Sequence, residues 1–156
     1  MKNKNECNET LLNTLYKVSK LSMNSIEDVL PLTKDKIFQT TISEVHSKYE
    51  VIKKECEMIA KAQQITLTPV DCITKFKNWA NVRIDALFDC STQNLAKILY
   101  GGTCCEIAEV IVDTVNCEEC EKEIYELAEK LSNLQEHHIH TLKQILLKKE
   151  NAPNVS

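Results

Sequence analysis

The stretch Glu118–Lys148 reads EECEKEIYELAEKLSNLQEHHIHTLKQILLK and repeats apolar side chains every three or four residues. This spacing predicts an amphipathic α-helix, because a helix turns once every 3.6 residues. At 1.5 Å per residue the predicted helix is roughly 45 Å long. The residues expected on its inward face are Ile124, Leu127, Leu131, Leu134, Gln135, His138, Leu142 and Ile145. A rod of this length needs neighbours of similar length to cover its apolar face.

Three other segments, 9–30, 33–64 and 92–115, show the same periodicity and are predicted to be long helices. Only a few residues around Pro31 separate the first two, which indicates an antiparallel hairpin. We expect Thr33 to cap the second helix. No segment alternates apolar and polar residues as a strand would. The sequence therefore predicts an all-α fold, an antiparallel four-helix bundle.

A shorter helix is expected over 70–88, between the second and third long helices, and Ser91 is expected to cap the third. We expect a single domain over 9–148, a flexible N-terminus over 1–8 and a disordered tail over 149–156.

The 156 residues carry a formal net charge of −4, which argues against a nucleic-acid-binding protein. No run of 18 apolar residues is present, so no membrane span is expected. The polar start lacks the apolar core of a secretory leader, which favours a cytoplasmic location. A chain with two glycines cannot form a glycine-rich phosphate loop.

Gly101 and Gly102, the only glycines, stand together in the predicted helix 92–115. Glycine in a helix interior costs roughly 1 kcal/mol relative to alanine. We therefore expect this pair to make room for a close neighbour, such as another backbone or a bulky side chain.

A polar layer is predicted across the middle of the bundle, because each long helix has a small or polar residue on its inward face near its centre. These residues are Ser22, Tyr49 with His46 at its flank, Gly102, and His138 with Gln135 one turn earlier. Mid-helix positions in an antiparallel bundle fall at similar heights, so these side chains are expected to meet.

Di-iron carboxylate bundles build their metal site at such a level, with a Glu from each of two helices and a Glu-x-x-His from each of the others. In the predicted register no carboxylate points inward, although a shift of one residue would bring in Glu44, Glu106 or Glu136. Two interpretations stay open. In the first, His138 is a core histidine that is hydrogen-bonded to Gln135, Tyr49 or Ser22. In the second, His46, Gln135 and His138 hold a metal ion.

The segments ITKFKNW (residues 73–79) and DCSTQNLAKILYGG (residues 89–102) resemble uncharacterised ferritin-like four-helix-bundle proteins from clostridia. The resemblance covers about residues 11–147. It implies a ferritin-like bundle with an extra helix between the second and third long helices, and many members lack the carboxylate ligands. It implies no activity.

Eight cysteines are present, and with no export signal we expect free thiols rather than disulfides. Cys117-Glu-Glu-Cys120 offers two ligands to zinc. Cys104 and Cys105 lie too far along a continuous helix to complete that site, so Cys7 or another chain would have to contribute. The same motif also suggests a thiol-redox sensor.

The sequence thus favours a non-enzymatic ferritin-like bundle with a degenerate di-metal site, acting as a structural or interaction protein. Self-association or a protein partner would involve the segment around Phe76 and Trp79. The alternatives are a metal-binding or metal-handling protein that uses His or Cys ligands for zinc or iron, and a redox sensor. His137 and His140 share a face that is expected to be solvated.

Overall fold

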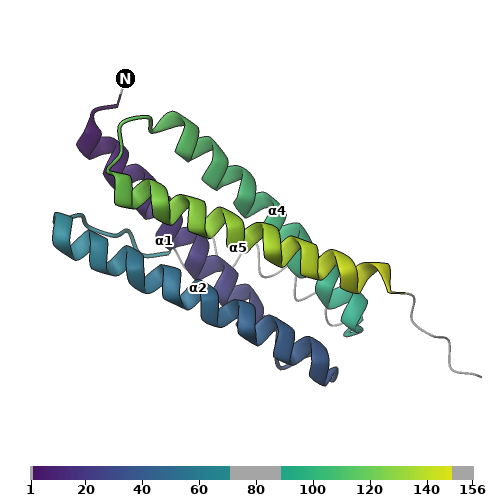
Figure 1. Cartoon of the computed structure of the whole chain (residues 1–156). Helices are drawn as coiled ribbons and strands as arrows, with labels where there is room; N and C mark the ends of the chain where they lie inside the picture. Colours follow the sequence, from purple (N-terminus) through teal and green to yellow (C-terminus); the bar gives the residue numbers. More distant parts are fainter. Residues whose placement is uncertain (1, 71–88, 149–156) are drawn as a thin grey trace, which may run out of the picture.

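The computed structural model describes residues 2–70 and 89–148, which form four long α-helices (Figure 1). The helices are α1 (Lys4–Val29), α2 (Lys36–Gln63), α4 (Thr92–Asn116) and α5 (Lys122–Leu147). No strand occurs among these residues, so the predicted all-α fold of four packed helices is confirmed. Of the shorter helix expected over 70–88, all but Val70 lies outside the described residues, as does the tail 149–156.

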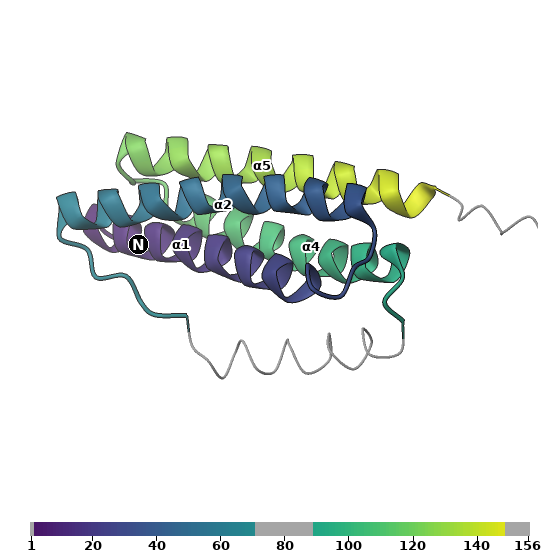
Figure 2. The ribbon, with the colours of Figure 1, turned by 90° about the horizontal axis from the view of Figure 1, so that it is seen from below.

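The helices pack as a bundle in which α1 and α5 run in one direction and α2 and α4 in the other (Figures 1 and 2). α1 packs against α2 and α4, and α5 packs against the same two helices from the opposite corner. α2 and α4 therefore lie at diagonal corners of the bundle and run parallel to each other. The start of α1, the end of α2 and the α4–α5 turn consequently meet at one end (Figure 1).

The core is formed by the predicted apolar stripes of α1, α2 and α5. On α5 the fully or almost fully buried residues are Ile124, Leu127, Ala128, Leu131, Leu134, Gln135, His138 and Leu142. These match the expected inward face, with Ile145 half-buried at its end. The apolar periodicity of α5 therefore predicted its buried face correctly.

Helix α1 begins at Lys4, five residues before the expected boundary. The Asn3 side chain accepts from the Glu6 amide at 3.0 Å, and the Glu6 carboxylate accepts from the Asn3 amide at 3.1 Å. This reciprocal capping satisfies donors that are otherwise unpaired at a helix start. Residues 4–8, which were expected to belong to a flexible N-terminus, are part of α1.

The cap of α2 also differs from the prediction. Asp35, not Thr33, accepts from the amides of Ile37 and Phe38, at 2.9 and 3.1 Å, while Thr33 accepts from the Asp35 amide. The predicted cap of α4 is confirmed, since Ser91 accepts from the Asn94 amide at 3.2 Å.

The predicted register of α4 is wrong. Gly102, expected to face inward, is exposed, and the buried residues are Leu95, Ala96, Leu99, Thr103 and Val110. A Cβ atom added to Gly101 or Gly102 would meet nothing within 4 Å, so neither glycine makes room for a neighbour among the described residues. The inward-facing stripe was misassigned because α4 has apolar residues on its solvent side as well.

Candidate metal centre

Three cysteines converge where α1 begins and α4 turns into α5. Cys7 lies in the first turns of α1, Cys117 is the C-cap of α4, and Cys120 ends the short turn before α5. Their Sγ atoms all lie within 4.8 Å of one another. Thiolates bound to one zinc ion at about 2.3 Å lie roughly 3.8 Å apart, so small side-chain movements complete such a site.

The sequence places Cys7 at this end because it stands one helical turn before Leu11 on the buried face of α1. Cys7 and Cys117 are both buried, at 2% and 0% exposure, whereas Cys120 is half-buried. The group of three sulfur atoms is thus accessible to solvent at Cys120 and enclosed elsewhere.

Asn8 fixes the turn against α1 beside these thiols. Its Oδ1 accepts from the Glu121 amide at 2.8 Å, and its Nδ2 donates to Gln63 Oε1 at 3.4 Å. Lys4 and Glu121 add an exposed ion pair at 2.8 Å. Asn8 therefore ties α1, the end of α2 and the cysteine-containing turn together.

Replacing Asn8 with alanine is expected to weaken zinc binding by about 10-fold, because groups that orient metal ligands typically contribute 10- to 100-fold in affinity. The measurement is a zinc titration against a competing chelator. Asn5→Ala is the matched control, since Asn5 is an exposed asparagine one turn away. Equal affinity of the Asn8→Ala and Asn5→Ala proteins would show that Asn8 does not position the thiols.

The environment of these thiols raises their pKa values. Burial, followed by the neighbouring Cys117 and Cys7, raises the pKa of Cys120 to about 12. Burial and the contact with Cys7 also raise the pKa of Cys117. Without a metal ion both groups are protonated at neutral pH, so they are poor nucleophiles.

The other cysteines of the described residues lie elsewhere, and all seven described cysteines carry free thiols. Cys56 is buried in the core, and burial raises its pKa to about 12. Cys90, Cys104 and Cys105 are exposed. The structure thus brings Cys7, rather than Cys104 or Cys105, to the Cys117–Cys120 pair.

The predicted polar layer contains a carboxylate, which corrects the sequence-based register. Ser22 Oγ donates to Glu106 Oε2 at 2.5 Å, where Gly102 was expected to face inward. Burial raises the pKa of Glu106 to about 7 despite this hydrogen bond. One carboxylate is fewer than the four that a di-iron bundle uses at this level.

His138 lies at the same level and is 2% exposed. Its Nδ1 lies 3.3 Å from the Tyr49 hydroxyl and 3.5 Å from Thr103 Oγ1. Burial, and then the nearby His137, lower the pKa of His138 to about 4, so the ring is neutral. Tyr49 is therefore a hydrogen-bond partner of His138, in agreement with the interpretation of His138 as a core histidine.

The remaining candidates of this layer are not brought together. Gln135 is fully buried, and neither its Nε2 nor its Oε1 has a hydrogen-bond partner among the described residues, nor has His138 Nε2. Of the three partners considered for His138, the structure therefore shows Tyr49 and not Gln135. His46 Nε2 lies within hydrogen-bond distance of Glu27 Oε1, at 2.8 Å, in a half-exposed contact away from His138.

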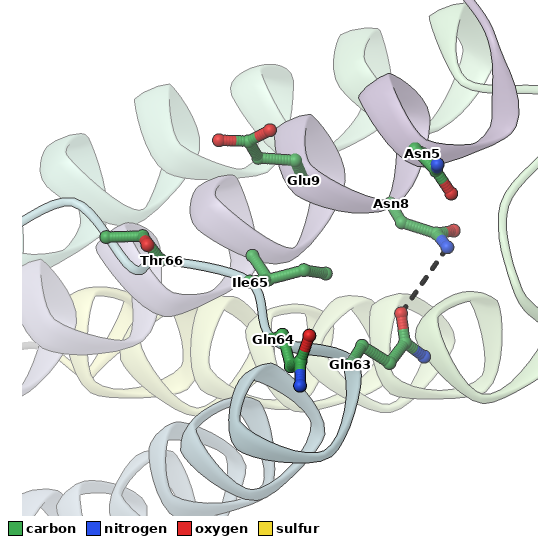
Figure 3. A pocket seen from close by; sticks show the side chains of 7 residues that line it. All are labelled: Asn5, Asn8, Glu9, Gln63, Gln64, Ile65 and Thr66. Carbon is green, nitrogen blue, oxygen red and sulfur yellow. Dashed lines mark hydrogen bonds between the residues drawn. The ribbon is translucent and has the colours of Figure 1, made fainter.

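A polar pocket of about 320 Å³ lies at the same end of the bundle as the three thiols (Figure 3). The side chains of Asn5 and Asn8 on α1 face Gln63 and Gln64 at the end of α2, with Ile65 beside them. No cysteine lines this pocket, which separates it from the metal centre.

Comparisons with protein-family models, with curated proteins and with solved structures found no match to this chain. Within the described residues, no helix has the length and apolar character that crossing a membrane requires.

Proposed function

We propose that this protein binds one zinc ion through Cys7, Cys117 and Cys120. The main support is the approach of Cys7 from α1 to the Cys117–Cys120 pair, with all three sulfur atoms within 4.8 Å of one another. Thiolate ligands select soft or borderline ions such as Zn²⁺ and Cu⁺ over calcium or magnesium. Three protein ligands leave a fourth zinc position for water or another ligand.

The charge of the site favours zinc over monovalent copper. Three thiolates carry a charge of −3, which becomes −1 with Zn²⁺ and −2 with Cu⁺. The surroundings are acidic: Asp113 raises the pKa of Cys117, and Glu118, Glu119 and Glu121 lie in or beside the turn. A divalent ion therefore leaves less uncompensated negative charge in a half-buried place.

The raised thiol pKa values also predict the proton balance of binding. Cys117 and Cys120 are protonated in the free protein and must lose their protons to ligate the metal. Zinc binding near pH 7 should therefore release at least about two protons, those of Cys117 and Cys120, and the affinity should rise with pH. Calorimetric titrations in buffers of different ionisation enthalpy measure this number, and a value near zero would contradict a thiolate site.

The zinc proposal is tested by loading protein that carries no histidine tag, in the presence of a phosphine reductant, followed by dialysis and elemental analysis. We expect about one zinc ion per chain, the stoichiometry of a single site. Retention of less than a tenth of that amount would overturn the proposal.

The non-enzymatic function that the sequence favours, in a ferritin-like bundle with a degenerate di-metal site, is compatible with this proposal. It is supported by the polar layer, where Glu106 is one carboxylate against the four of a di-iron bundle, and by the long connection between α2 and α4. We keep a cytoplasmic location as part of the proposal, because free thiols persist in a reducing compartment. A partner contact around Phe76 and Trp79 stays a prediction, since both lie outside the described residues.

The redox-sensor alternative is less well supported by the chemistry. A reactive sensor cysteine needs a low pKa and an electropositive, exposed setting. Cys117 and Cys120 have raised pKa values and acidic neighbours.

A further inference from the structure

Helix α4 has its acidic side chains turned toward the bundle rather than toward solvent. Each of the three acidic residues in its second half bonds to a side chain of α1. The pairs are Glu106 with Ser22 at 2.5 Å, Glu109 with Lys17 at 2.6 Å, and Asp113 with Thr14 at 2.5 Å. In this half of α4, the side that faces solvent therefore has no acidic residue.

The outward face of α4 is apolar over four turns. At 100° per residue, seven exposed residues lie within about 60° of the direction of Ala108. We call this set the α4 face: Gly101, Cys104, Cys105, Ala108, Ile111, Val112 and Val115. Ile111, Val112 and Val115 are 53%, 55% and 65% exposed. Large neighbouring side chains left in water in this way mark an interaction surface.

The α4 face is complementary to itself in size. If a two-fold axis passes through Ala108, an antiparallel copy of the helix pairs positions whose numbers add to about 216. Small residues of one half then meet large residues of the other: Gly101 with Val115 of the partner subunit, Cys104 with Ile111 of the partner subunit, and Cys105 with Val112 of the partner subunit, the last two being one residue apart in height. The glycine at one end thus lets the valine at the other end approach closely.

The charged residues beyond the two ends of the α4 face fit the same two-fold arrangement. Lys97 and Glu119 are both exposed and lie just beyond the two ends of the α4 face, Lys97 within α4 and Glu119 in the turn that follows its last residue, Asn116. Neither takes part in an ion pair within residues 2–70 and 89–148. The two-fold arrangement places Lys97 just beyond the C-terminal end of α4 of the partner subunit, where the helix dipole and the acidic turn that follows the helix are negative, so attraction favours the same register as packing.

We propose that the α4 face binds α4 of a second copy, giving a symmetric antiparallel dimer centred on Ala108. The exposed face and its rim offer on the order of 500 Å² per copy, which reaches the roughly 1,000 Å² in total that a specific interface needs. A two-fold interface presents the same patch on both subunits, which the pairing of small with large residues satisfies.

The experiment uses opposite charges at the symmetry centre. We expect the full-length wild-type chain to be a dimer by analytical ultracentrifugation. Ala108→Glu and Ala108→Lys should each weaken it by at least about 100-fold, because position 108 faces itself and like charges are juxtaposed. An equimolar mixture of the two variants should restore dimers, since each dimer then pairs one glutamate with one lysine.

Ser43→Glu, at an exposed position on α2, is the matched control and should leave the dimer unchanged. Circular dichroism should show all three variants folded, because Ala108 and Ser43 are exposed. A monomeric wild type, as expected if residues 71–88 cover the α4 face, would overturn the proposal. A dimer that survives Ala108→Glu, or one that mixing does not restore, would also overturn it.

Discussion

Cys7→Ser is expected to weaken zinc binding by about 100-fold, because apparent binding energies of 10–16 kcal/mol for four-ligand zinc sites average about 3 kcal/mol per ligand. Cys7 is the ligand that comes from α1, whereas Cys117 and Cys120 share one turn. Without Cys7 the remaining pair is a two-thiolate site on a short segment. Competition titration with a chromophoric chelator measures the change.

Cys90→Ser is the matched control for this experiment. Cys90 is exposed and lies one residue before the cap of α4, at the end of that helix far from the Cys117–Cys120 turn. Its loss should leave zinc affinity unchanged. Equal affinities of the Cys7→Ser and Cys90→Ser proteins would show that Cys7 is not a ligand.

The second large effect concerns the pH dependence of stability, through Glu106 and His138. The folded-state pKa of Glu106 is raised from 4.5 to about 7, so its contribution to stability is fully present below pH 4.5 and is lost as pH rises toward 7. The pKa of His138 is lowered from 6.5 to about 4, so its contribution is present above pH 6.5 and is lost as pH falls toward 4. Between pH 4.5 and 6.5 the two contributions oppose each other.

Substituting either residue should therefore reveal the pH dependence that the other residue contributes to the free energy of unfolding. In Glu106→Gln, the free energy of unfolding should rise by about 3 kcal/mol between pH 4.5 and 6.5, relative to the wild type. In His138→Asn it should fall by a similar amount over the same interval. Gln can still accept the hydrogen bond from Ser22, which preserves the contact that Glu106 makes.

Urea unfolding at several pH values measures how the free energy of unfolding changes with pH. A loss of packing in either variant shifts this free energy equally at every pH, so it does not affect the comparison. Glu129→Gln, at an exposed position on α5, is the control and should follow the wild type. Parallel pH profiles for the wild type and Glu106→Gln would mean that this carboxyl titrates as an ordinary solvated group.

The fold was predictable mainly where one face of a helix alone is apolar. On α5 and α2 the polar residues stand opposite the buried ones, so periodicity identified the inward face, including Tyr49 and His138. On α4 it did not, because Ile111, Val112 and Val115 face solvent while Glu106 faces α1. Hydrophobic periodicity assumes that the apolar face is buried, and a helix whose apolar face is exposed defeats that assumption.

The candidate metal site was predictable only in part. The spacing of Cys117 and Cys120 was visible as a local motif, and Cys7 was one of the open choices for a third ligand. What brings Cys7 to them is the antiparallel packing of α1 and α4, which places the end of α4 beside the start of α1. That topology is a property of the whole fold. The local signal was the position of Cys7, four residues before Leu11 on the same buried face.

X-ray absorption at the zinc edge of the loaded, reduced protein tests the metal centre most directly. The account predicts about three sulfur neighbours at roughly 2.3 Å and one lighter atom in the first coordination shell. A shell of nitrogen and oxygen atoms alone would place the ion elsewhere and contradict a centre built from Cys7, Cys117 and Cys120.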